Sequence, residues 1–114
     1  MIYELRTYWA APGKIKALHH RFSTLTLGIF QRYQMEVIGF WTPQPAAPET
    51  GDLVYLLRFP SEAAKAAAWS AFQNDPQWIA GKAASEVDGK LVEDWDSWTV
   101  LPLFQQTVAV LQAQ

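Results

Sequence analysis

The sequence lacks the features that mark several large functional classes. It contains no cysteine, which excludes disulfide bonds, thiolate catalysis and cysteine-based zinc or iron–sulfur sites. Lysine and arginine form no cluster, and nine basic residues against eleven acidic ones give a net charge of −2. A nucleic-acid partner is therefore not expected. No hydrophobic run reaches the roughly 20 residues of a membrane span, so we expect no membrane span. Without cysteine, and with a first strand that leaves no room for a signal peptide, the expected location is the cytoplasm.

Short motifs for common chemistries are missing as well. There is no glycine-rich phosphate loop, no carboxylate spacing of a metal site and no partner near Ser85 and Glu86 for a serine-type triad. The only histidines are His19 and His20, and adjacent helical residues point about 100° apart, so the two cannot share a metal. A haem would need a well-placed axial histidine, which His19 is not expected to supply. We predict no metal and no cofactor.

Hydrophobic residues, by contrast, make up 50% of the 114 residues, and six residues are tryptophan. This composition and length predict one globular domain. Period-two alternation, helical steps of three and four, and turn residues divide the chain into elements. We expect strands at 2–9, 36–42, 53–59 and 93–101, and helices at about 13–33, 61–74 and 76–87. Gly28 is expected to loosen the end of the first helix, and the early first strand leaves no room for a signal peptide.

This order predicts an α+β protein with a ferredoxin-like βαββαβ fold, in which the first and third strands lie in the centre of a four-stranded antiparallel sheet. The helices can cover only one face of such a sheet. A large uncovered apolar patch is rare on a soluble monomer, so we predict a homodimer in which two open sheet faces pack together. We expect the open face to present several of Ile2, Tyr8, Val54, Leu56, Trp98 and Val100.

Several segments together resemble the NIPSNAP family. They are "MIYELRTY" at 1–8, "PGK" at 12–14, "GFWT" at 39–42, "AAW", "F" and "DPQW" across 67–78, "SEVDG" at 85–89 and a final "LP". The resemblance covers residues 1–104 and leaves 105–114 as a C-terminal tail. It implies a ferredoxin-like subunit and a dimeric α+β barrel, but no catalytic residues, because the family has no agreed ones. The trafficking and mitophagy roles of its mitochondrial members are not transferred.

Glu4 and Arg6 are the first candidate site residues, because both lie on one side of the first strand. We expect them to line the space between the two sheets of the dimer, where Arg6 could hold an anion and Glu4 could orient a polar ligand. The alternative is a structural ion pair, extended by Arg58 or Asp96 from neighbouring strands. The sequence leaves both interpretations open.

The other candidate ligand-binding residues are one histidine, several aromatic residues and one arginine. His19 flanks the apolar stripe of the first helix and could reach the sheet, or it could be an ordinary residue at the helix flank. The aromatic residues could form a pocket for a flat ligand or could simply pack in the core. The remaining candidates are Tyr8, Trp41, Arg58 and Trp98.

Two functions remain open from the sequence. The first is a non-catalytic homodimer that binds a small apolar or amphipathic ligand or a protein partner. The alternative is a cofactor-independent enzyme that acts as a monooxygenase or isomerase in the barrel cavity, an idea that rests on analogy with other dimeric α+β barrels. An open cavity between the sheet and the helices would keep the enzyme possible, whereas a filled one would remove it.

Overall fold

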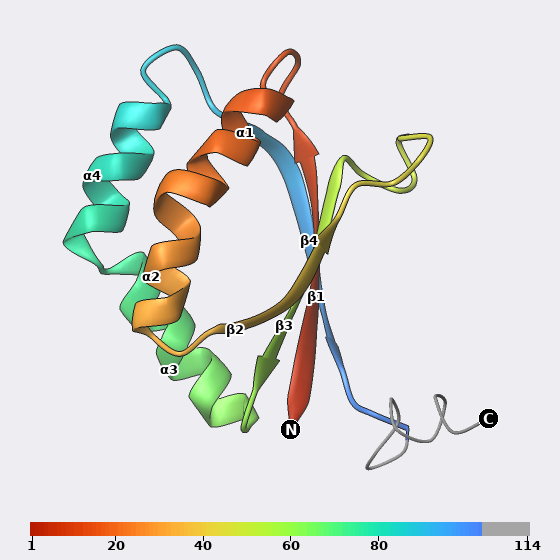
Figure 1. Ribbon diagram of the computed structural model, residues 1–114, viewed down its shortest axis with the longest axis vertical. Coiled ribbons are helices and arrows are strands. Elements are labelled where there is room, and N and C mark those ends of the chain that lie inside the picture. Colours follow the sequence, from red (N-terminus) through yellow and green to blue (C-terminus); the bar gives the residue numbers. More distant parts are fainter. Residues whose placement is uncertain (104–114) are drawn as a thin grey trace.

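The computed structural model describes residues 1–103, so the tail predicted at 105–114 lies outside the described residues. A four-stranded antiparallel sheet forms one layer, and the helices form a second layer on one of its faces (Figure 1). The fold is α+β with the ferredoxin-like βαββαβ order, as the sequence predicts. Across residues 1–103, no helix is both long enough and apolar enough to pass through a bilayer.

The sheet consists of β1 (Ile2–Ala10), β2 (Glu36–Trp41), β3 (Leu53–Phe59) and β4 (Val92–Val100), in the spatial order β2-β3-β1-β4. The central position of the first and third strands is therefore confirmed. The proline-rich segment 43–52 connects β2 to β3 and extends away from the sheet (Figure 1).

The first helical region is continuous but contains an irregular turn. It comprises α1 (Ile15–Arg21), the π-helical turn η1 (Phe22–Thr26) and α2 (Leu27–Arg32). In η1 the Leu27 amide donates to the carbonyl of Phe22, five residues earlier, which widens the helix. The irregularity lies before Gly28, whereas the sequence predicted that Gly28 would loosen the last turns.

The second helical region is broken where the sequence predicts it. Helix α3 (Glu62–Gln73) begins at Ser61, whose hydroxyl accepts a hydrogen bond from the Ala64 amide at 3.1 Å. Helix α4 (Pro76–Ser85) begins at Asp75, which caps it, and has proline in its first turn. Helix α4 lies against α1, η1 and α3.

The residues of β1 alternate between the two faces of the sheet. Glu4 pairs with Leu57 of β3 and Arg6 with Tyr55, and both partners are fully buried beneath the helices. Glu4 and Arg6 therefore face the helices. The expectation that they face the open side was wrong, because the alternation of a strand does not itself identify the covered face.

The open face carries the other set of β1 residues. Ile2 and Tyr8, which we had expected there, point toward the helices, and Tyr3 and Leu5 take their place. The pairing puts Val54, Leu56, Trp98 and Val100 on the open face, as expected. Trp98 is 60% exposed there.

Candidate functional site

Glu4 is a buried carboxylate with three hydrogen-bond donors. It is only 3% exposed. Its Oε1 accepts from Trp69 Nε1 at 2.6 Å, and its Oε2 accepts from Arg6 Nη1 at 2.8 Å and from Ser97 Oγ at 2.6 Å. Burial acts to raise the pKa of Glu4, but the hydrogen bonds from Ser97, Trp69 and Arg6 outweigh it and hold the pKa below its ordinary value. Glu4 is therefore a stable anion.

Arg6 lies between two indole rings. Its guanidinium carbon is 4.3 Å from the centre of the Trp69 ring and 4.8 Å from that of Trp95. Arg6 also donates to the Tyr8 hydroxyl, from Nε at 3.3 Å and from Nη2 at 3.1 Å. Tyr8 in turn shares a hydrogen bond of 2.8 Å with Tyr55, whose pKa burial holds well above its ordinary value. Together these contacts fix the orientation of the guanidinium.

Arg58 and Asp96 do not extend this network, contrary to the expectation from the sequence. Arg58 lies on the open face of the sheet, where it binds Glu36 through two hydrogen bonds of 2.8 and 2.6 Å. Asp96 stands opposite Thr7 on that same face. Because strand pairing puts both residues on the far side of the sheet, neither can reach Glu4.

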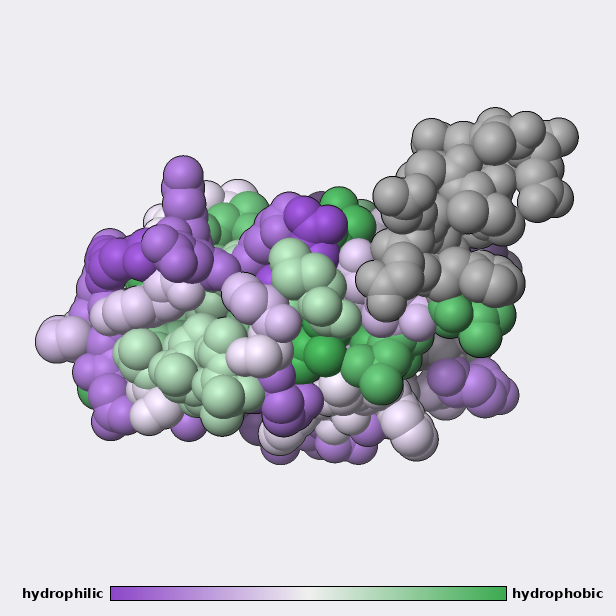
Figure 2. Space-filling model, turned by 90° about the horizontal axis from the view of Figure 1, so that it is seen from below, coloured by the Kyte–Doolittle hydropathy of each residue, from purple (hydrophilic) through white to green (hydrophobic). Residues whose placement is uncertain are grey.

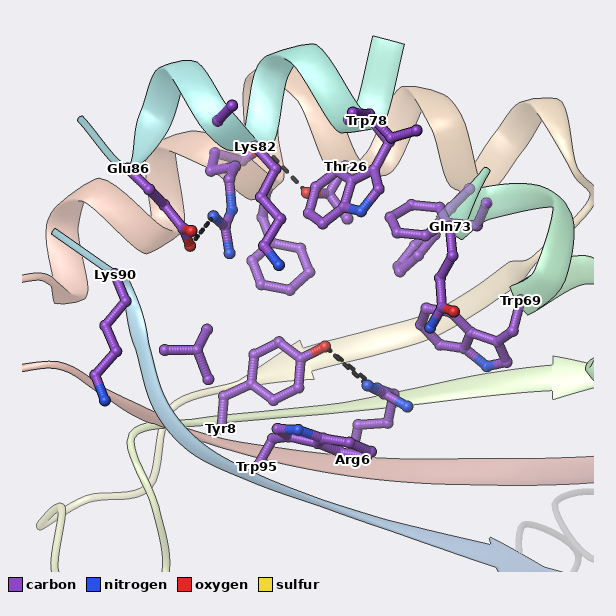
Figure 3. Close-up of a pocket in the computed structure, with 17 residues that line it drawn as sticks. Arg6, Tyr8, Thr26, Trp69, Gln73, Trp78, Lys82, Glu86, Lys90 and Trp95 are labelled. Carbon is purple, nitrogen blue, oxygen red and sulfur yellow. Dashed lines mark hydrogen bonds and ion pairs between the residues drawn. The ribbon is translucent and has the colours of Figure 1, made fainter. Parts of the chain in front are cut away.

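The sheet–helix pocket is a cavity of about 870 Å³ between the sheet and the helices (Figure 3). Arg6 and Tyr8 line its sheet side, and Lys82 and Glu86 extend into it from α4 and the residue that follows α4 (Figure 3). Seven of the seventeen residues that line the pocket are aromatic. The aromatic lining residues are Tyr8, Phe22, Phe30, Trp69, Phe72, Trp78 and Trp95.

Ion pairs hold α4 to the first helical region at both ends. At the C-terminal end of α4, Arg21 donates to Glu86 at 2.9 Å and to Ser85 at 3.1 Å. At its start, Asp75 accepts from Tyr33 at 2.6 Å and is paired with Arg32. Hydrogen bonds from the Tyr33 hydroxyl, the Trp78 backbone amide and the Arg32 side chain together lower the pKa of Asp75 to about 2. Helix α4 is thus fixed as the outer wall of the pocket.

Two other candidates lie in a separate hollow. His19 and Trp41 line a shallower depression of about 350 Å³ beside the edge strand β2, together with Phe22 and Phe40. His19 is exposed and does not line the sheet–helix pocket. Within residues 1–103 no group of three potential metal-ligating side chains occurs. The predicted candidates therefore lie in three places: Arg6 and Tyr8 line the pocket, His19 and Trp41 line the hollow, and Arg58 and Trp98 lie on the open face. Glu4 does not line the pocket but binds Arg6, which does.

Several residues of the site have no signal in the local sequence. Ser97 reaches Glu4 only because β4 pairs with β1 in a register that sets it opposite Arg6. Trp69 is one aromatic residue among many until α3 places its indole N–H on the carboxylate. Lys82 is an ordinary helical lysine in the sequence, and only the position of α4 directs it into the pocket.

The fold and the pocket define a class: a ferredoxin-like α+β subunit with an aromatic, basic pocket between its sheet and its helices. A model of the NIPSNAP family matches residues 3–104. The chain belongs to the NIPSNAP family.

Solved structures of bacterial relatives agree with this assignment. An uncharacterized NIPSNAP domain protein from Burkholderia xenovorans is 25% identical, with a TM-score of 0.76 over 92% of this chain and 97% of that one. A NIPSNAP family protein from Agrobacterium tumefaciens is 18% identical, with a TM-score of 0.77 over 91% of this chain and 94% of that one. The comparison with curated proteins finds no match to the chain.

Proposed function

We propose that this NIPSNAP protein binds a small amphipathic molecule in the sheet–helix pocket. The observation that carries the proposal is the pocket itself, whose volume of about 870 Å³ is in the range of small-molecule sites. Such sites are mostly apolar with a few polar groups, and this pocket combines an aromatic wall with the oriented guanidinium of Arg6.

The position of α4 supports this proposal. None of its residues is fully buried, although it carries Trp78 and Ile79 on the side that lines the pocket. A helix that only completed a hydrophobic core would bury such residues. A ligand between α4 and the sheet would cover them and so gain hydrophobic stabilisation.

The test of this function is native mass spectrometry of the full chain purified from its own host. We expect a small molecule to copurify with the wild type. Ala83 lines the pocket from α4, and an indole at this position should occupy part of the cavity. The Ala83→Trp variant should therefore lack the molecule. Equal retention by the folded variant would refute the proposed site, and a wild type that carries no small molecule would count against ligand binding.

We also propose that two copies associate through their open sheet faces. The support is the apolar surface opposite the helices, where Trp98 is 60% exposed and Val100 is 41% exposed. Hydrophobic surface also occurs at the lower end of the molecule, where β1 begins and β4 ends, as Figure 2 shows. A second copy would cover the same patch on both chains, as a two-fold interface requires.

Sedimentation equilibrium at micromolar concentration tests the homodimer. The expected mass is about twice the 12.9 kDa of the chain. Trp98→Asp should shift the mass toward the monomer, because it puts a charge into the centre of the interface. Val87→Asp is the matched control, since Val87 is 79% exposed and lies in the connection between α4 and β4 rather than on a strand of the sheet. A wild-type mass near 12.9 kDa would refute the dimer.

A second candidate, a cofactor-independent enzyme, is favoured by the Tyr8 hydroxyl. Tyr8 lines the pocket, and its hydroxyl accepts two hydrogen bonds from Arg6 and shares one with Tyr55, so it can exchange a proton with a bound substrate once the substrate replaces Tyr55 as its partner. Tyr8→Phe would then abolish turnover of the copurified molecule while preserving its binding. Unchanged turnover in Tyr8→Phe would remove Tyr8 from the reaction.

A further inference from the structure

The charges around the sheet–helix pocket are not balanced. Four basic residues and one acidic residue line it, and three of the basic residues have carboxylate partners. The pairs are Arg6 with Glu4 at 2.8 Å, Arg21 with Glu86 at 2.9 Å and Lys90 with Glu93 at 3.2 Å. Lys82 has no ion pair among residues 1–103. The uncompensated positive charge of the pocket is therefore that of Lys82.

The helix places Lys82 on the pocket side. Trp78, Lys82 and Glu86 follow one another at steps of four, which puts them on one face of α4 and its end. Figure 3 shows the Lys82 side chain extending from α4 into the pocket, toward its sheet side. A lysine ammonium carries three donors and no acceptor, so an anionic oxygen is its natural partner.

Arg6, at the other side of the pocket, contributes no net charge. Glu4 neutralises it, and three of the five N–H groups of a guanidinium are already used. The remaining N–H groups can donate to a neutral acceptor such as a carbonyl or hydroxyl oxygen. The two sides of the pocket therefore favour different groups on one ligand.

We propose that the ligand is an organic monoanion with a flat apolar body, and that Lys82 is the residue that selects its anionic group. A carboxylate or sulfonate contacts Lys82, the aromatic wall contacts the body, and a neutral polar group lies near Arg6. This inference rests on the proposed small-molecule function, and it assigns the class of ligand and a binding residue that the sequence did not indicate.

Two fluorescent probes of similar shape test the charge preference. The anion 8-anilinonaphthalene-1-sulfonate and the neutral N-phenyl-1-naphthylamine share their aromatic rings and differ in the sulfonate. In Lys82→Gln we expect the affinity for the anion to fall about tenfold at low salt, which corresponds to about 1.4 kcal/mol, while the affinity for the neutral probe changes less than about twofold. Lys82→Arg should keep the wild-type affinity for the anionic probe.

Lys16→Gln is the matched control, because Lys16 is an exposed lysine on α1 that does not line the pocket. It should leave both affinities unchanged. If Lys82→Gln weakens both probes equally or neither, the inference is wrong. Ala83→Trp separates this failure from failure of the pocket: if it abolishes binding of the neutral probe, the pocket is the site, whereas neutral binding that survives in the folded variant overturns both proposals.

Discussion

Replacement of Glu4 by glutamine is the sharpest perturbation of the site, because it preserves shape while removing the charge and one acceptor oxygen. Glu4 receives bonds from donors alone: Trp69 and Arg6 contact different oxygens, and Ser97 shares the oxygen that Arg6 contacts. A glutamine offers one oxygen and one amide nitrogen. Whichever way it is oriented, its NH₂ group must therefore face a donor that it cannot accept from.

The size of the effect follows from which donor loses its partner. If the amide oxygen faces Trp69, the Ser97 hydroxyl can rotate and accept, but Arg6 cannot. If the oxygen faces Arg6 and Ser97, the Trp69 N–H loses its acceptor, and in both orientations the Arg6 charge loses its counterion. Removing one partner of a buried ion pair costs about 3–5 kcal/mol. We expect the lower end, about 3 kcal/mol, because the Arg6 side chain is 11% exposed and borders the pocket.

The assay is urea unfolding followed by tryptophan fluorescence, at one protein concentration because dimerisation would link stability to concentration. Glu62→Gln is the matched control: Glu62 pairs with Lys65 on α3, on the helix side of the sheet, and its side chain is 65% exposed. It should lose less than about 1 kcal/mol. A loss below about 1 kcal/mol for Glu4→Gln would show that the buried network is not a major source of stability.

Three further predictions concern stability. The free energy of unfolding should fall as the pH drops from about 4 toward 2. The reason is that Asp75, with a pKa lowered to about 2, stays charged in the folded protein over this range and takes up a proton only when the protein unfolds. In Asp75→Asn the free energy of unfolding should depend less on pH in this range. Gly51→Ala should lower the midpoint temperature of thermal unfolding more than Gly13→Ala does. Both glycines have φ near 74°, but only a Cβ at position 51 would lie 2.5 Å from the Thr7 side chain. Equal decreases would contradict this contact argument. Ser61→Ala should lose about 1 kcal/mol in urea unfolding as the cap of α3 is removed, and no loss would show that the cap is dispensable.

The local signals in the sequence were sufficient for the fold. The break between α3 and α4 follows from Asp75 and Pro76, because a capping side chain followed by proline is a typical start of a helix. The central position of β3 follows from its continuous apolar run. These are properties of neighbouring residues, so one sequence contains them. The π-helical turn η1 has no comparable signature, since Phe22–Thr26 fits an ordinary amphipathic helix equally well.

The faces of β1 could not be predicted in the same way. The set Tyr3, Leu5, Thr7 and Trp9 is the more apolar one, and hydrophobicity alone assigns it to the covered side. The structure covers the charged set, because α3 and β4 supply Trp69 and Ser97 as donors for Glu4. Such compensation depends on residues about 65 and 93 positions away. The composition of a strand cannot reveal donors that come from other elements.

This correction separates two functions that the sequence had combined in one place. Glu4 and Arg6 face the helices, whereas Trp98 lies on the opposite face of the sheet. The proposed ligand pocket and the proposed dimer interface therefore share the sheet but no side chain. We expect Trp98→Asp to produce monomers that still bind N-phenyl-1-naphthylamine with nearly wild-type affinity in a fluorescence titration. If binding disappears with the dimer, the partner subunit must complete the pocket, and a site built from one chain alone would be wrong.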